Sequence, residues 1–304
     1  MGALEELEQA VGQIAGQVGG SVVGIGRGWG RGSGVVVADG RVVTNAHNLR
    51  GDEVTVVFAG GRSATGHVRG VDVDGDLAVV DVDTAGAPAV SWADPGSPVA
   101  VGTVVFALAS PGGRQRVTAG LVSAVDRAFR GPRGRRIAGS VEHTAPLARG
   151  SSGGPVVNRA GQLVGLNTHR LGEGFYVALP ADAELRGRID ALARGESPAR
   201  PRLGIGIAPG GVARKLRRAV GLPERDGLLV RVVEEASPAD RAGVRAGDLV
   251  VAVDGQPVSD ADQLYEALDR VSGPSLALGI VRGVEERTVT DTFGEGGPRD
   301  VGSA

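Results

Sequence analysis

Short valine-rich runs alternate with glycine and aspartate turns over the first two thirds of the chain. The runs include GVVVADGRVVTN, EVTVVFAGG, DLAVVDVDT and TVVFALA. Within the first of them, Asp39-Gly40 is a strong hairpin signal between two valine runs. Strands at this spacing, with no amphipathic helices between them, are typical of an all-β barrel or sandwich. The pattern predicts a β domain over residues 20–181, which is long enough for two small barrels.

The periodicity changes on both sides of this domain. Five apolar residues near the start follow a helical spacing of three and four: Leu4, Leu7, Val11, Ile14 and Val18. Residues 182–194 also have a helical pattern, which the sequence GESPARP then ends. Strand-like runs and helical stretches at 238–242 and 260–271 follow. We expect a helical segment 1–19, the β domain 20–181, a helix and linker 182–201, a second domain 202–293 and a disordered tail 294–304.

Composition excludes several classes of function. A chain of 304 residues is long for a single domain, and 41% apolar residues suffice for a packed core. With 33 basic against 35 acidic residues, the chain lacks the positive field that nucleic-acid binding needs, so no nucleic-acid partner is expected. The absence of cysteine excludes disulfides and thiolate nucleophiles. No paired His and acidic spacing suggests a metal site, so we expect neither a metal nor a cofactor.

Two further patterns bear on location. The N-terminus lacks the basic start and continuous apolar core of a signal peptide, and no stretch approaches the ~20 apolar residues of a membrane helix. The chain as written is therefore expected to be cytoplasmic, without an integral membrane segment. The alternative is the cell envelope, if a leader was removed.

The candidate chemistry lies in three fragments of the β domain. They are Thr44-Asn45-Ala46-His47, Asp76-Leu77-Ala78-Val79 and Gly150-Ser151-Ser152-Gly153-Gly154-Pro155. Acyl transfer by serine needs an imidazole base, a carboxylate that fixes its tautomer, and backbone donors for the oxyanion. Glycines beside a serine let two amides converge on one point. Each part of a serine hydrolase is thus available.

These fragments resemble the His, Asp and Ser motifs of trypsin-like proteases, in that order. More closely, they resemble the HtrA (Deg) family of PDZ-bearing proteases, whose usual forms are TNAHV, a DLAV-type segment and GNSGGP. The resemblance implies a mainly β fold, with a trypsin-like double β-barrel followed by a PDZ domain. It implies a serine endopeptidase that acts on unfolded or damaged proteins through an acyl-enzyme. It also implies peptide partners and a homotrimer. Members of the family commonly form trimers through an N-terminal segment that carries aromatic residues, whereas residues 1–19 here contain none.

Site residues follow from this resemblance. Ser152 is the expected nucleophile, His47 the base and then acid, and Asp76 the orienting carboxylate, with the amides of Gly150 and Ser152 as the oxyanion hole. Asp72 and Asp74 lie close by, but only Asp76 directly precedes an apolar run. The primary specificity pocket is expected to favour small or medium apolar side chains, because no acidic residue is among its walls: Leu147, Leu166, Asn167 and Thr168.

Alternatives and departures remain beside this hypothesis. Residues 150–154 also satisfy G-x-S-x-G, the nucleophile elbow of esterases, but Pro155-Val156-Val157 resembles a strand where the elbow needs a helix. A peptide-binding adaptor or chaperone with an idle protease fold is the other alternative. Ser151 and Asn48 replace the family's usual Asn and Val. The other histidines are interpreted as structural: His67, His143 and His169.

The second domain resembles a bacterial PDZ module. Residues 202–205 resemble its carboxylate-binding loop, whose amides hold a peptide C-terminus while the peptide adds a strand to the sheet. The helix over 260–271 is expected to form the other wall of the groove. The resemblance assigns peptide binding to six residues: Arg202, Leu203, Gly204, Ile205, Leu264 and Leu268.

Overall fold

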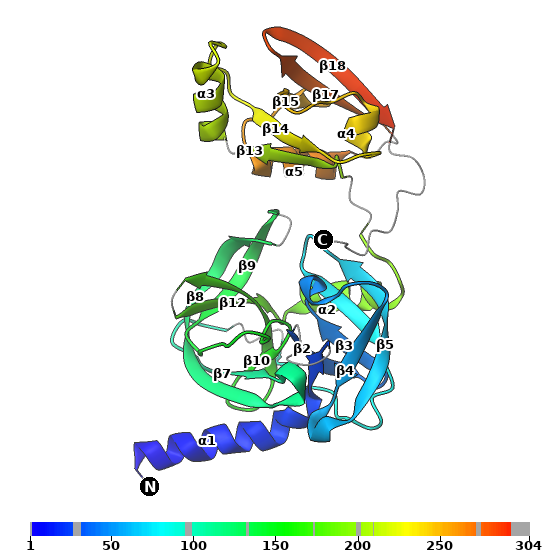
Figure 1. Ribbon diagram of the computed structural model, residues 1–304. Helices are drawn as coiled ribbons and strands as arrows, with labels where there is room; N and C mark the ends of the chain where they lie inside the picture. Colours follow the sequence, from blue (N-terminus) through cyan, green and yellow to red (C-terminus); the bar gives the residue numbers. More distant parts are fainter. Residues whose placement is uncertain are drawn as a thin grey trace. The chain divides into compact units, whose positions relative to one another are not determined.

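The computed structural model describes residues 2–26, 32–94, 99–131, 134–172, 174–198, 202–208, 210–271 and 275–292. The chain folds as two compact units that divide in the sequence after residue 198 (Figure 1). Both units are mainly β, as the sequence predicted. The expected tail 294–304 and the last three linker residues, 199–201, lie outside the described residues.

The first unit contains two closed six-stranded antiparallel barrels. The first has the order β1-β2-β3-β6-β5-β4 and the second the order β10-β11-β12-β9-β8-β7. The first barrel is built from β1 Val22–Ile25, β2 Gly32–Ala38, β3 Arg41–Thr44, β4 Glu53–Val57, β5 Ser63–Asp72 and β6 Leu77–Asp81. The second is built from β7 Val104–Ala109, β8 Arg116–Arg130, β9 Arg136–His143, β10 Pro155–Val157, β11 Leu163–Gly172 and β12 Phe175–Pro180.

Alternation along the strands fills each barrel. In β4, for example, Val54 and Val56 are buried while Glu53 is exposed, as expected for a strand with one inward face. Closure of the barrels leaves no unpaired edge strand in either sheet. The largest apolar cluster contains residues of both barrels, including Val43 from the first and Phe106 from the second. The two barrels therefore share a core.

Two helices close the outside of this unit. Helix α1, Ala3–Val18, contacts β7 and β8, and helix α2, Ala183–Ala193, contacts β5 and β6 (Figure 1). In α1 only the last part of the predicted apolar stripe is buried, since Ile14 is in the core but Leu4 is 82% exposed. Helix α2 begins at Asp182, whose side chain accepts a hydrogen bond from the Leu185 amide at 2.8 Å. Four short 3₁₀ turns complete the unit: η1 Gly19–Ser21, η2 Ala46–Asn48, η3 Ala59–Gly61 and η4 Pro111–Gly113.

The second unit is a sheet of order β13-β14-β15-β17-β18, with β16 paired to β15. Its strands are β13 Ile205–Ala208, β14 Leu228–Val233, β15 Leu249–Val253, β16 Gln256–Pro257, β17 Ser275–Arg282 and β18 Glu285–Thr292. Its helices are α3 Gly210–Ala219, α4 Pro238–Arg241 and α5 Ala261–Arg270. The sequence predicted α4 and α5 but not α3, because that segment starts with two glycines and carries a run of basic residues. Among the described residues, no helix is long and apolar enough to cross a membrane.

Candidate active site

His47 and Asp76 form the centre of the candidate site. Strand β3 runs into the 3₁₀ turn that carries His47, whose side chain is 34% exposed. Its Nδ1 lies 2.9 Å from each carboxylate oxygen of Asp76. An ionised carboxylate can only accept, so the proton of this contact belongs to Nδ1, and Nε2 is left as a base.

Asp76 is buried and held by several donors. It lies in the turn between β5 and β6 with a positive φ of 52°, and its residue is 1% exposed. Its carboxylate accepts hydrogen bonds from the His47 amide at 3.2 Å and from Thr168 Oγ1 at 2.5 Å. The Asn45 side-chain amide donates to the Asp76 carbonyl at 2.9 Å. A buried carboxylate needs such donors, because it is otherwise strongly disfavoured away from water.

The neighbouring acidic residues have other partners. Asp72 accepts from Arg188 at 2.9 Å and from the Gly75 amide, so it fixes the turn to helix α2. Asp74 lies 3.5 Å from the Arg135 guanidinium. Of these three aspartates, Asp76 is the one that hydrogen-bonds the His47 ring.

Hydrogen bonds hold the backbone of Ser152 in place, whereas its side-chain hydroxyl has a single hydrogen-bond partner among the described residues. Its carbonyl accepts hydrogen bonds from the Ser33 amide at 2.8 Å and the Asn48 side-chain amide at 3.0 Å. Its Oγ donates to the Thr168 carbonyl at 3.1 Å. The hydrogen bonds of the described residues include none between this hydroxyl and His47. A rotation about the Cα–Cβ bond of Ser152 is therefore needed before the hydroxyl can donate to the imidazole.

The loop around Ser152 requires glycine at two positions. Gly150 has φ 83°, and a Cβ there would lie 2.9 Å from Pro111 Cβ; Gly153 has φ 85°, and a Cβ there would lie 2.2 Å from the Ser33 carbonyl oxygen. Ser33 Oγ donates to the Gly150 carbonyl at 2.7 Å. Within the described part of the chain, the amides of Gly150 and Ser152 donate to no protein acceptor, so both are available to an oxyanion.

The segment after Ser152 is strand β10, Pro155–Val157. An esterase elbow would continue as a helix at this point, and the strand removes that alternative. Asn48, which replaces the family's usual Val, also gains a role, since its amide bridges the Ser152 carbonyl and Thr44 Oγ1. Sequence reasoning did not find this role, because the bond joins residues 104 positions apart.

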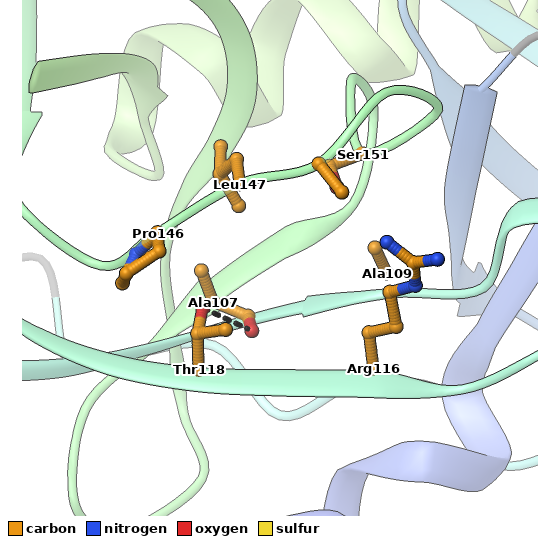
Figure 2. Close-up of a pocket in the computed structure, with 8 residues that line it drawn as sticks. Ala107, Ala109, Arg116, Thr118, Pro146, Leu147 and Ser151 are labelled. Atoms are coloured by element: carbon orange, nitrogen blue, oxygen red, sulfur yellow. Dashed lines mark hydrogen bonds between the residues drawn. The ribbon is translucent and has the colours of Figure 1, made fainter. Parts of the chain in front are cut away.

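The four expected pocket residues have different surroundings. Leu166 is fully buried in the core. Asn167 is also buried, and its side chain bonds the Gly154 carbonyl at 3.1 Å and His143 Nε2 at 2.9 Å. Thr168 is bonded to Asp76. Leu147 lines a pocket against β7 and β8 whose walls include none of the other three (Figure 2).

His143 fits the structural interpretation given to it from the sequence. Its residue is fully buried, and its ring stacks on Tyr176 with the centroids 5.9 Å apart. Burial lowers the pKa of His143, and this effect outweighs the hydrogen bond to Asn167 and the charge of Glu142, which raise it. The ring is therefore neutral at physiological pH.

In the second unit, the expected carboxylate loop precedes β13, which is an edge strand among the described residues. Strand β13 pairs with β14 on one side and is the first strand in the sheet order. Gly204 has φ 72°, and a Cβ there would lie 2.3 Å from Ser237 Cβ. The carbonyls of Leu203 and Gly204 accept from the amides of Ala239 and Glu234, which fixes the loop.

The side chains expected to bind peptide have different surroundings. Arg202 pairs with Glu234 at 2.6 Å on the surface. Leu203 is buried, and Ile205 is partly buried against the same core. Leu264 and Leu268, each 3% exposed, are both part of that core. The structure therefore places these two leucines under the sheet as packing residues.

Comparison with known proteins agrees with this architecture. Residues 32–166 match the trypsin-like peptidase domain family, and residues 229–282 match the PDZ domain family. The probable periplasmic serine endoprotease DegP-like of Halomonas elongata is 34% identical over 272 residues, which cover 86% of this chain and 56% of that protein. The putative serine protease HhoA of Synechocystis is 34% identical over 273 residues, which cover 85% of this chain and 69% of that protein.

Solved structures with the same fold include the serine endoprotease from Yersinia pestis. It is 25% identical, with a TM-score of 0.61, and the match covers 93% of this chain and 96% of that one. The HtrA-type protease AlgW with decapeptide is 23% identical, with a TM-score of 0.63 and coverage of 93% and 97%. The chain spans only 56% of the length of the Halomonas relative. On the sequence relatives and the two matched domains, this chain belongs to the HtrA/Deg family of trypsin-like serine proteases that carry a PDZ domain.

Proposed function

We propose that the chain is a serine endopeptidase with Ser152 as nucleophile, His47 as general base and Asp76 as the carboxylate that orients it. The observation that carries this proposal is the contact between the buried Asp76 carboxylate and His47 Nδ1, at 2.9 Å from each carboxylate oxygen. This contact fixes the tautomer in which Nε2 is the base and stabilises the imidazolium formed on proton transfer.

The reaction proceeds in two acyl transfers. Ser152 Oγ turns from the Thr168 carbonyl to His47, gives its proton to Nε2 and attacks the carbonyl carbon of the substrate. The amides of Gly150 and Ser152 stabilise the resulting oxyanion. The imidazolium then protonates the leaving amine, and the acyl-enzyme is hydrolysed by a water molecule that His47 deprotonates. The residues named supply every proton transfer, so the proposed reaction requires no metal or cofactor.

Substrate and partner follow from the second unit and the relatives. We propose unfolded or damaged proteins as substrates and peptide C-termini as ligands of the PDZ domain. The open edge of β13 supports strand addition by a peptide, and the fixed loop before it supports capture of a terminal carboxylate. The AlgW protease, which shares this fold, was solved with a decapeptide, and this is in keeping with a peptide ligand. The homotrimer implied by the family resemblance is part of the same proposal.

We propose the cell envelope as the location. The Halomonas elongata relative is named as periplasmic, and this supports the envelope alternative over the cytoplasmic expectation drawn from the N-terminus.

The first prediction concerns the nucleophile. Ser152→Ala is expected to lower the hydrolysis of an unfolded protein by about 10⁴-fold or more, because members of a triad act as a unit. A fluorophosphonate probe should label the wild-type chain and not the variant. The matched control is Ser63→Ala, an exposed serine on β5, which should cleave and label like wild type. If wild type neither cleaves nor labels, even with an added PDZ peptide, the chain is the adaptor instead.

The second prediction concerns Thr168 as a positioning residue. Thr168→Val removes the hydroxyl that donates to Asp76, so kcat should fall by about 10- to 100-fold, the worth of one hydrogen bond to a charged group. KM should change little, because the hydroxyl is bonded to Asp76. Thr168→Ser keeps the donor and should restore most of kcat. The proposed role is contradicted if Thr168→Val keeps the wild-type kcat, or if the kcat of Thr168→Ser is as low as that of Thr168→Val.

The third prediction concerns the PDZ loop. Gly204→Ala forces a Cβ to within 2.3 Å of Ser237 Cβ at a positive φ, which should distort the loop and weaken binding of a peptide with a free C-terminus by about tenfold or more. Binding is measured by fluorescence anisotropy on the full-length Ser152→Ala chain. Gly211→Ala, where a Cβ meets nothing within 4 Å, is the control. Equal binding of a C-terminally amidated peptide would refute carboxylate capture.

A further inference from the structure

A pocket of about 260 Å³ lies beneath the loop that carries the oxyanion donors. Its walls come from β7, β8 and the segment 146–151 (Figure 2). It lies in the first unit and includes neither His47 nor Ser152. Ser151, which stands between Gly150 and Ser152 in the chain, belongs to its wall. The pocket therefore touches the catalytic loop at Ser151, between the two residues whose amides are the expected oxyanion donors.

The floor of the pocket is set by strand register. Ala107 is paired with Thr118, and Ala109 with Arg116. Side chains two apart on a strand share one face, and directly paired residues lie on the same face. Two alanines on this face leave a hollow that larger residues would fill. Both alanines are buried, whereas the loop residue Leu147 above them is partly exposed.

One end of the pocket carries polar groups without partners. The Ser151 residue is 3% exposed, and its hydroxyl forms no hydrogen bond among the described residues. The exposed guanidinium of Arg116 likewise has no hydrogen bond or ion pair within that part of the chain. In Figure 2, Arg116 and Ser151 lie toward one end of the pocket, and Pro146 and Leu147 toward the other. Both groups line the pocket and neither is bound by another group of the described residues, so a hydroxyl and a cation are available there to a ligand.

We propose that this pocket binds a carboxylate that carries a small branched aliphatic group, and that its occupation supports the loop that holds Gly150 and Ser152. The guanidinium of Arg116 pairs with the carboxylate, and the Ser151 hydroxyl donates to it. The aliphatic group packs on Pro146, Leu147 and the two alanines. The volume suits a group of a few carbon atoms. The regulatory half of this proposal rests on the proposed function.

Binding is tested without any need for catalysis. The full-length Ser152→Ala chain, with labelled alanine and leucine methyl groups, is titrated with isovalerate while the methyl signals of Ala107, Ala109 and Leu147 are followed. These signals should shift saturably with isovalerate and not with isovaleramide, which lacks the charge. Arg116→Gln should weaken this binding about tenfold or more. Arg159→Gln, an exposed arginine on another turn, makes the same charge change and should bind like wild type.

The titration also separates two sources of the carboxylate. A short peptide that ends in valine should shift the same three methyl groups if the natural ligand is a chain terminus. If only isovalerate shifts them, the ligand is a free monocarboxylate. The proposal is overturned if no probe shifts these methyl groups, if isovaleramide shifts them equally, or if Arg116→Gln binds isovalerate as wild type does.

Regulation is tested by hydrolysis of an unfolded protein with and without isovalerate. Wild type should gain about fivefold or more in kcat, within the usual range of coupling between sites. Arg116→Gln should keep its basal rate and show no gain. Methyl shifts without a gain in kcat would overturn the regulatory half. A wild-type chain that binds isovalerate but never cleaves would refute the proposed function and leave the binding site standing.

Discussion

The buried carboxylate of Asp76 is the constraint on which the rest of the candidate site depends. A carboxylate with 1% exposure must be met by donors, and here the donors come from both barrels. His47 belongs to the first barrel and Thr168 to β11 of the second. The same pair of bonds that satisfies Asp76 therefore orients the His47 ring and brings the two barrels together at the site.

A second set of hydrogen bonds fixes the backbone of the nucleophile. The Ser152 carbonyl accepts from the Ser33 amide and from Asn48, while Thr44 Oγ1 donates to the Ser33 carbonyl at 2.7 Å. The Ser152 backbone is thus held to β2 and to the 3₁₀ turn η2 that follows β3, while its hydroxyl bonds only the Thr168 carbonyl among the described residues. The loop before it is supported at the Gly150 carbonyl by Ser33, and Ser151 of the same loop lines the pocket. A ligand in this pocket would therefore contact the loop directly.

Short valine-rich runs broken by glycine and aspartate turns predicted the strands of the barrels. The resemblance to trypsin-like motifs indicated His47 and Asp76, and the position of Asp76 directly before an apolar run distinguished it from Asp72 and Asp74. The role of Thr168 could not be predicted in this way, because its bond to Asp76 spans 92 positions. Helix α3 was missed because its first residues are glycines and its burial depends on Ala213 and on Arg217, which bonds the Pro223 carbonyl. Leu264 and Leu268 show the converse problem. An apolar stripe along a helix can line a peptide-binding groove or pack into a core, and the pattern alone is the same in both cases.

The central claim is that Asp76 holds the His47 ring in the tautomer that leaves Nε2 as the base. The most direct test is proton NMR of the full-length Ser152→Ala chain with labelled histidine. The account predicts one strongly downfield signal from the His47 Nδ1 proton, which is lost in Asp76→Asn and moved in Thr168→Val. Absence of that signal, or a signal that Asp76→Asn leaves unchanged in a folded chain, would contradict it.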